Sequence, residues 1–335
     1  MMIELDWENF SVYVKTHSEG LIKVDGSCEG CPLRKACEDA KHEERIHAIL
    51  STPPEQTTHP ILIRLLKGMP FLLYLIPRRI YRMWSGYDND TLGCPSMQIL
   101  PHLSSHKKVY ELLTDADSRR TYLAALMFRL TFDNDYLKAV VSDGKEYFEC
   151  FHNLGSEEVV IDCGAYTGDT LQDYLSCNEV PRQYVLFEPD RANVEQLRKN
   201  IKEMHAEAYT VVHEKGVGET TKTLYLTEEN GMASKLSEQK AETSYTVDII
   251  SIDSLQIEDV SFIKMDIEGA EKAALTGARS TIQRYAPKLA ICLYHSPLDL
   301  WEVPLLIRDM VPSYQSFIVR HYHKYSFTET ILYVW

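Results

Sequence analysis

The sequence has little positive charge. Lys and Arg number 35 against 49 Asp and Glu, which gives a formal net charge of −14 over 335 residues. A protein that binds nucleic acid over a broad surface needs clustered cationic side chains to neutralise phosphates. We therefore expect no nucleic-acid partner, and the acidity by itself indicates only solubility.

Long uninterrupted apolar runs are also missing. Residues 61–84 are strongly apolar, but charged residues, Gly68 and two prolines interrupt them, so they are too broken to span a bilayer. The arginines at 78–82, with Tyr81 and Trp84, are compatible with a helix that contacts a membrane surface or a partner. Packed helices of an accessory region are the preferred interpretation. The acidic N-terminus does not resemble a signal peptide, so we expect a cytoplasmic protein.

Eight cysteines without a secretory signal indicate reduced thiols. Three of them, Cys28, Cys31 and Cys37, begin with a C-x-x-C pair, which is metal-ligand spacing for zinc or an iron–sulfur cluster. Cys94 is the best candidate for a fourth ligand, and His42 and His47 are alternatives. Plain thiols in a small turn explain the pattern equally well. A metal here would be structural, because nothing nearby resembles an open coordination position.

The segment 159–170 predicts a strand, a glycine turn and a helix. Residues 159–161 form an apolar β-branched run, typical of a strand buried on both faces. Asp162 ends this strand, and Gly164 and Gly168 follow in a tight turn that lets the backbone approach a ligand. In an open parallel α/β sheet, ligands bind just outside the carboxyl ends of the strands.

A second acid at a strand end points to a nucleoside. Residues 184–188 form the next apolar run, and Glu188 ends it, where a carboxylate can accept hydrogen bonds from both ribose hydroxyls. The loop after Asp162 lacks the G-x-G-x-x-G spacing of dinucleotide sites. Its acid would repel a pyrophosphate but can hold the ammonium of a methionine moiety. The sequence thus favours S-adenosylmethionine over a dinucleotide, or over a turn that binds nothing.

The remaining pattern continues the alternation of strands and helices. Further strands are predicted at 209–213, 223–226, 246–252, 262–266 and 289–293, with a closing antiparallel pair at 317–319 and 330–334. Gly216 and Val217 are expected in a turn that borders an adenine. Tyr147 and Phe148, after an Asp-Gly pair, predict a short hairpin. The cofactor-binding residues expected from the whole pattern are Asp162, Gly164, Ala165, Tyr166, Gly168, Thr170, Glu188, Pro189, Gly216, Val217 and Asp266.

The third strand-end acid, Asp266, is the first candidate for the base of a methyl transfer. An acceptor hydroxyl is a poor nucleophile while protonated, so a base within hydrogen-bond reach helps. His295 is the second candidate, because a histidine can hold a proton near neutral pH. Lys264 and Glu268 are expected to orient the acceptor.

Two alternatives remain open at this site. Lys264 and Glu271 are equally compatible with a structural ion pair between sheet and helix. Asp266, Glu268 and Glu271 are also compatible with a divalent cation that acidifies the hydroxyl. His321 is a candidate for lining the acceptor pocket, with a surface turn as the competing interpretation.

Five segments together resemble the FkbM-type methyltransferases: 162–170, 187–190, 252–255, 262–271 and 329–333. The resemblance covers about 145–335. Its most specific part is the Lys-x-Asp-x-Glu-Gly-x-Glu block that begins at Lys264. The resemblance implies a class I methyltransferase fold, S-adenosylmethionine as donor and O-methylation, often of a sugar or polyketide hydroxyl.

We therefore expect a Rossmann-like, mostly parallel α/β sheet with helices on both faces and an antiparallel last strand, preceded by a mainly helical region. The expected division is a cysteine-containing segment at 1–60, a helical accessory region at 61–145 and a methyltransferase domain at 146–335. The accessory region would cover the site or mediate homodimerisation. The expected partner is a small-molecule or carbohydrate acceptor. Two competing hypotheses are a non-catalytic module that binds S-adenosylmethionine or a partner through a cysteine knuckle, and a dinucleotide-dependent oxidoreductase.

Overall fold

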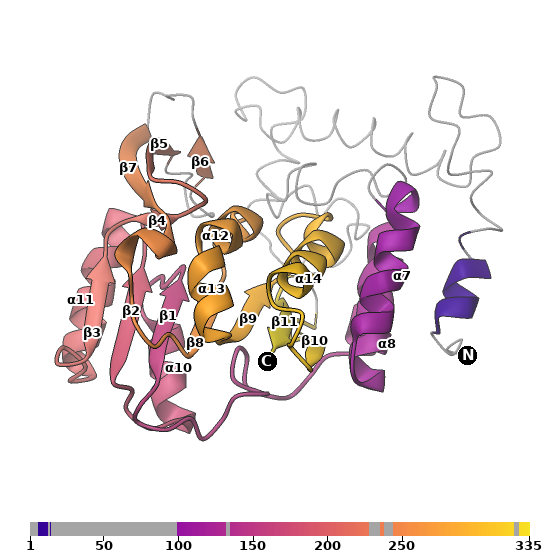
Figure 1. The fold of residues 1–335 in the computed structure, drawn as a ribbon, viewed down its shortest axis with the longest axis horizontal. Helices are drawn as coiled ribbons and strands as arrows, with labels where there is room; N and C mark the ends of the chain where they lie inside the picture. Colours follow the sequence, from indigo (N-terminus) through magenta and orange to yellow (C-terminus); the bar gives the residue numbers. More distant parts are fainter. Residues whose placement is uncertain are drawn as a thin grey trace, which may run out of the picture.

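The chain folds around one large sheet, shown in Figure 1 in a computed structural model that describes residues 6–12, 14, 99–131, 135–227, 235–237, 244–324 and 328–335. The sheet has seven strands in the order β10-β11-β9-β8-β1-β2-β3. These are β1 (Val159–Cys163), β2 (Gln183–Phe187), β3 (Thr210–His213), β8 (Phe262–Met265), β9 (Lys288–Cys292), β10 (Phe317–His321) and β11 (Thr330–Val334). Neighbouring strands from β9 to β3 are parallel, and β11 runs antiparallel to both β9 and β10.

Helices cover both faces of this sheet. Figure 1 shows α12 (Glu271–Gly277), α13 (Arg279–Tyr285) and α14 (Asp299–Met310) in front of the sheet and α10 (Asp169–Cys177) behind it. The helix α11 (Arg191–Glu203) links β2 to β3. The strand order reverses at β1, so crossovers of the same right hand place the helices of the two halves on opposite faces. The predicted fold class, including the antiparallel last strand, is confirmed.

The central strands form because most of their residues are apolar and pack on both faces of the sheet. All five residues of β1 are buried, and the side chains of β8 are buried as well. The following helices keep one apolar face: α11 buries Val194, Leu197 and Ile201, spaced as one helical stripe. Asp190 caps α11 by accepting hydrogen bonds from the backbone N–H groups of the first turn.

A second, smaller sheet lies beside the first. Its order is β4-β7-β5-β6, formed by β4 (Gly216–Val217), β5 (Lys222–Thr227), β6 (Lys235–Ser237) and β7 (Ser244–Ile250). The turn predicted at Gly216 and Val217 is therefore wrong, because these two residues pair in parallel with Ile249 and Ile250. Between the two sheets, η4 (Ile252–Leu255) carries Asp253, whose carboxylate accepts the first N–H groups of α13.

The helices before β1 pack against the far edge of the large sheet. They are η3 (Leu100–His102), α7 (Leu103–Leu112), α8 (Ala116–Thr131) and α9 (Asp135–Lys138). The start of α8 is tied to β10 by Ser118, whose side chain accepts a hydrogen bond from the backbone N–H of Val319. Trp7 packs on Tyr110 of α7, with ring centroids 5.4 Å apart. None of the described helices is long and apolar enough to cross a membrane.

Two other predictions concern the hairpin near residue 147 and the cysteine metal site. The hairpin predicted around Tyr147 and Phe148 is wrong, because these residues lie in a turn in which Tyr147 has a φ of 61°. The aromatic rings of this turn pack into the core, for example Phe148 on Phe262. The candidate metal ligands Cys28, Cys31, Cys37 and Cys94 lie outside the described residues, as do His42 and His47.

Candidate functional site

The site is built where β1, β2, β8 and β9 end. Because these four strands are parallel neighbours, their carboxyl ends meet at one edge of the sheet. Glu188 follows β2, Asp266 follows β8, and the pair Tyr294-His295 follows β9 closely. Local patterns singled out Asp162 near the end of β1, Glu188, Asp266 and His295, and these four residues therefore belong to one region.

The glycine loop after β1 is fastened to both neighbouring strands. The backbone N–H groups of Gly164 and Ala165 donate to the carbonyl of Phe187, each at 3.0 Å. Gly164 has a φ of 82°, and a Cβ atom at this position would lie 1.8 Å from the carbonyl oxygen of Asp266. Only glycine fits a left-handed position with so close a backbone neighbour.

Asp162 lies beneath this loop and is fully buried. Its Oδ1 is 3.1 Å from Lys264 Nζ, and Tyr184 donates its hydroxyl to Oδ2 at 3.3 Å. The predicted role of Asp162 in holding the ammonium of a methionine moiety is therefore wrong, because its carboxylate is enclosed and already paired with a cation. Asp162 instead anchors the lysine that supports the loop.

Lys264 is not an acceptor-orienting residue either. Its side chain is only 2% exposed, and Nζ donates to the carbonyl of Gly164 at 2.7 Å. Burial would lower the pKa of Lys264, but the carboxylates of Asp162 and Asp266 outweigh burial and raise it. The alternative pair between Lys264 and Glu271 is also wrong: Lys264 pairs with Asp162, and Glu271 contacts His295.

Glu188 is held in place by backbone donors. Its Oε2 accepts the N–H of Tyr166 at 2.9 Å, and its Oε1 accepts the N–H of Asp190 at 2.9 Å. Burial raises the pKa of Glu188 above its usual value, although these N–H donors oppose that effect. The side-chain amide of Asn193 also donates to Oε1, at 3.4 Å. A carboxylate has about four acceptor positions, so about one remains for a hydroxyl group of a ligand. The side chain of Tyr166, next to it, is 56% exposed.

Two tyrosines that the sequence analysis did not assign to the site hold Asp266. Tyr147 donates its hydroxyl to Oδ2 at 2.8 Å, and Tyr294 donates to Oδ1 at 2.9 Å. Burial would raise the pKa of Asp266, but Lys264, His295 and the two hydroxyl donors outweigh burial and hold the pKa below its usual value. Asp266 is therefore ionised at neutral pH, and its side chain keeps 24% of its surface exposed.

His295 is surrounded by carboxylates. Its Nδ1 lies 2.8 Å from Glu271 Oε1, and its Nε2 lies 3.4 Å from Asp266 Oδ1 and 3.5 Å from Glu268 Oε2. Burial would lower the pKa of His295, but the three carboxylates outweigh burial and raise the pKa to about 9. His295 therefore carries a proton at neutral pH, which contradicts its predicted role as a base in the arrangement described here.

The structure brings most of the predicted site residues to the same edge of the sheet. Glu268, at φ 56°, and Gly269, at φ 95°, form the turn that leads from Asp266 into α12. Thr170 is buried in the first turn of α10, and Gly168 precedes that helix. His321 ends β10, which runs in the same direction as β9 two strands away, so it lies at the same edge of the sheet. It is buried, and its ring contacts Thr330 and the carbonyl of His323, so the surface turn is wrong, whereas its place in the acceptor pocket stays a prediction.

The missed residues come from parts of the chain that carry no local signal. Tyr147 is 119 residues from Asp266 in the sequence. Arg129 of α8 is buried and donates to the carbonyl of Tyr294 at 2.9 Å, which connects the accessory helices to the site. Only Tyr294 could have been found, because it stands beside His295 just after a predicted strand.

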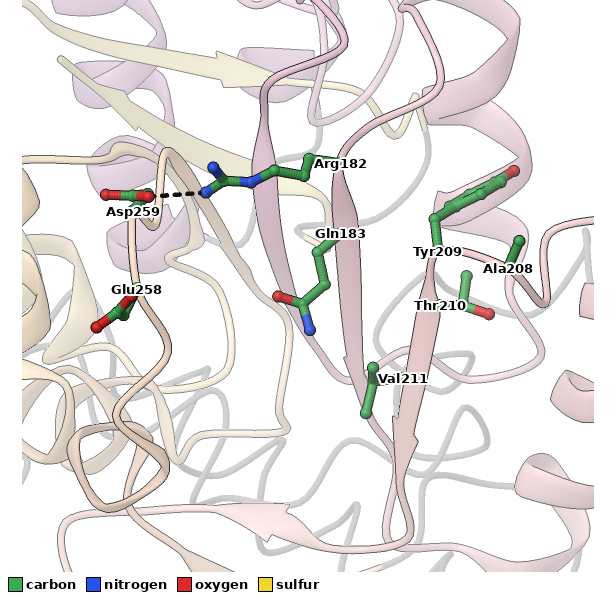
Figure 2. Close-up of a pocket in the computed structure, with 8 residues that line it drawn as sticks. All are labelled: Arg182, Gln183, Ala208, Tyr209, Thr210, Val211, Glu258 and Asp259. Atoms are coloured by element: carbon green, nitrogen blue, oxygen red, sulfur yellow. Dashed lines mark hydrogen bonds and ion pairs between the residues drawn. The ribbon is translucent and has the colours of Figure 1, made fainter.

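The pocket drawn in Figure 2 is at another place. It is lined by residues at the starts of β2 and β3 and by Glu258 and Asp259, and Arg182 pairs with Asp259 at 3.0 Å. Its volume is about 420 Å³. Strand starts lie at the opposite edge of a parallel sheet from the strand ends, so this pocket does not belong to the site.

Comparisons with known proteins agree with this geometry. Residues 162–325 match the family described as Methyltransferase FkbM domain. The structure of a methyltransferase FkbM from Methylobacillus flagellatus KT is similar, with a TM-score of 0.61 and 27% identity over 71% of this chain and 60% of that one. The chain therefore spans 60% of the length of that relative.

Two further solved structures are more distant. An rRNA methylase from Streptococcus thermophilus has a TM-score of 0.36 and 12% identity over 54% of this chain and 87% of that one. A putative methyltransferase from Streptococcus mutans in complex with SAH has a TM-score of 0.35 and 10% identity over 61% of this chain and 95% of that one. No curated protein matches the chain.

Proposed function

Because residues 162–325 match the family described as Methyltransferase FkbM domain, we propose that the chain transfers a methyl group from S-adenosylmethionine to a hydroxyl of a small molecule or a sugar. The observation that carries the proposal is the meeting of Glu188 and Asp266 at one edge of the sheet, on either side of the glycine loop. That edge is where open parallel sheets bind their ligands.

The donor side consists of the glycine loop and Glu188. S-adenosylmethionine supplies a methyl group that is already activated by its positive sulfur. The residues present fit this cofactor: Glu188 is fixed by two backbone N–H groups and by Asn193, and it retains acceptor capacity for a ribose hydroxyl. Gly164 keeps the loop against β8, so the loop backbone remains in one position. A fixed donor site lowers the entropic cost of aligning the reacting atoms.

On the acceptor side, the chain contributes an ionised carboxylate. Asp266 is the proposed base: it is partly exposed, and Tyr147 and Tyr294 fix the direction of its carboxylate. It accepts the hydrogen bond of the acceptor hydroxyl and takes up its proton as the new carbon–oxygen bond forms. His295, being protonated, acts as a positioning residue that holds Asp266 and Glu268 together.

The accessory helices support the acceptor side in this proposal. Arg129 of α8 fixes the backbone at Tyr294, and α7 packs on α14. Described residues before β1, Arg129 and Tyr147 among them, therefore shape the surroundings of Asp266. We infer that acceptor identity depends on this region more than on the strand ends, which carry the motifs common to the family.

Calorimetric titration of the full chain with S-adenosylmethionine, and separately with NADH, tests the donor assignment. We expect saturable binding of S-adenosylmethionine and none of NADH. Glu188→Gln should weaken binding about tenfold, because an amide cannot accept both backbone N–H groups and the ribose hydroxyls. Glu195→Gln, on the exposed side of α11, is the matched control and should bind as the wild type does. Equal affinity in both variants would contradict the proposal.

Turnover separates an enzyme from a binding module. Transfer of a radiolabelled methyl group to any member of a panel of hydroxylated sugars and small alcohols, lost in Asp266→Asn, supports catalysis. Binding of the donor with no transfer to any acceptor would favour the non-catalytic hypothesis instead.

A further inference from the structure

Tyr166 is the only aromatic residue of the glycine loop, residues 164–168. Its side chain is 56% exposed and makes no hydrogen bond or ring contact with any described residue. The tyrosines around Asp266 differ from it, since Tyr147 and Tyr294 bury their rings and donate their hydroxyls to that carboxylate. The described contacts of the folded chain therefore give the ring of Tyr166 no structural role.

The backbone of Tyr166 is strained as well. Its φ is 46°, in the left-handed region that bulky side chains rarely adopt and that glycine adopts readily. The loop is fixed on both sides of this residue. The N–H of Tyr166 donates to Glu188, and the carbonyl of Thr167 accepts the side-chain amide of Asn200 at 2.7 Å. Strain of this kind gathers at ligand-binding sites, where a side chain is held in one place.

The strand order places this loop between the two ends of the proposed reaction. β1 lies between β8 and β2, so the loop after β1 lies between Asp266 and Glu188. In the proposed function, Glu188 binds the ribose and Asp266 meets the acceptor hydroxyl. The sulfur of S-adenosylmethionine is joined both to the ribose carbon chain and to the methyl group that moves to the acceptor. Its place in the reaction is therefore between these two acids, at the loop that carries Tyr166.

We propose that the aromatic face of Tyr166 binds the positively charged sulfur of S-adenosylmethionine. The face of an aromatic ring attracts a cation through its quadrupole. Asp162, the acid nearest to the loop in the sequence, does not serve this charge, because it is enclosed and paired with Lys264. The inference rests on the proposed function, since it takes S-adenosylmethionine as the ligand of this edge of the sheet.

The contact with Tyr166 would distinguish the donor from its product. As the methyl carbon bonds to the acceptor oxygen, its bond to sulfur breaks and the electron pair stays on sulfur, while the hydroxyl proton goes to Asp266. The product, S-adenosylhomocysteine, therefore has a neutral sulfur, and the attraction to the ring is lost. Tyr166 thus favours binding of the donor and eases release of the product.

Calorimetric titrations of the full chain with S-adenosylmethionine and with S-adenosylhomocysteine measure this preference as the ratio of the two dissociation constants. Tyr166→Phe keeps the ring and should keep the wild-type ratio. Tyr166→Leu has the same left-handed backbone but no ring, and it should reduce the preference for the donor about fivefold. Glu195→Gln, on the exposed side of α11, is the control and should leave the ratio unchanged.

The outcomes separate this inference from the proposed function. If Tyr166→Leu fails to fold, Tyr166→Gly makes the same comparison, because glycine accepts the backbone conformation. An unchanged ratio in the variants without a ring would overturn the inference, and so would an equal fall in Tyr166→Phe, which would assign the preference to the hydroxyl. Absence of S-adenosylmethionine binding in the wild type removes the proposed function itself.

Discussion

Lys264 and Asp162 stand opposite each other in the register of β8 and β1, and their charged atoms are 3.1 Å apart in the interior of the sheet. Lys264 Nζ also donates to the carbonyl of Gly164. The buried cation of Lys264 therefore connects β8 and β1 to the loop of the proposed donor site. The two strands are about a hundred residues apart in the sequence. The pair is buried beneath the loop and holds the loop to both strands.

Removing only the lysine should be strongly destabilising. Lys264→Met leaves Asp162 buried without its cation, and breaking a buried pair in this way costs about 3–5 kcal/mol. Urea unfolding at pH 7 measures the loss. The double variant Asp162→Leu with Lys264→Met removes both charges and should regain most of the lost stability. A loss below about 1 kcal/mol in the single variant would contradict the pairing.

Gly164→Ala should distort the loop. An alanine Cβ would lie 1.8 Å from the carbonyl of Asp266, and φ is 82° at this position. We expect about 2–4 kcal/mol of lost stability and much weaker binding of S-adenosylmethionine. Gly155→Ala is the control, because a Cβ there meets no atom within 4 Å. Thermal unfolding of the two variants makes the comparison, and equal melting temperatures would show that the loop tolerates a side chain.

His106 should make the protein sensitive to mild acid. It is fully buried in α7, with Nδ1 2.7 Å from the hydroxyl of Tyr122. Burial, helped by the positive charges of His102 and Arg129, lowers its pKa to about 3 from an ordinary 6.5. The unfolded chain therefore binds a proton between pH 6.5 and 3 that the folded chain does not, and stability falls as the pH drops through this range.

Urea unfolding at pH 7 and pH 5 tests the contribution of His106. We expect it to remove about 2 kcal/mol between these two pH values, within the larger dependence contributed by all titrating groups. His106→Gln, which cannot titrate, should lose about that much less than the wild type does. The same pH dependence in both proteins would mean that His106 is not held neutral.

Asp115 should stabilise the junction between α8 and β10 at neutral pH but not in acid. Its carboxylate accepts hydrogen bonds from Arg320 at 3.1 and 3.3 Å and from the N–H of Ser118 at 2.6 Å. Burial opposes these donors, but they lower the pKa of Asp115 below its ordinary value of 3.8. A carboxylate whose pKa is lowered by folding stabilises the folded chain at pH values above its ordinary pKa. This stabilisation is lost as the pH falls through the lowered pKa of the folded state.

We therefore expect Asp115→Asn to cost about 1 kcal/mol at pH 7, a value reduced because the side chain is 34% exposed. The difference from the wild type should shrink below pH 4. Asp117→Asn, whose side chain is 72% exposed, is the control and should change little. A constant difference from pH 7 to pH 3 would show that the charge of Asp115 is not what stabilises the junction.

Local sequence determined the strand–turn–helix units and the positions of the strand-end acids. Buried parallel strands need continuous apolar residues, and a tight turn with positive φ needs glycine, so residues 159–170 carry their structure in their own composition. Glu188 and Asp266 could be assigned to one edge for a similar reason: each ends an apolar run, and parallel strands bring equivalent ends together. The fold class followed from these patterns, as did the resemblance to the family whose model matches residues 162–325.

Tertiary structure alone decided which charges face each other. Asp162 and Lys264 are partners because β1 and β8 are adjacent in this register, and no local pattern contains that register. Tyr147 reaches Asp266 from a turn with no periodic signal. His295 changes from a predicted base to a protonated residue because three carboxylates from separate positions surround it. Electrostatic roles depend on distances across the fold, whereas sequence patterns report only neighbours along the chain.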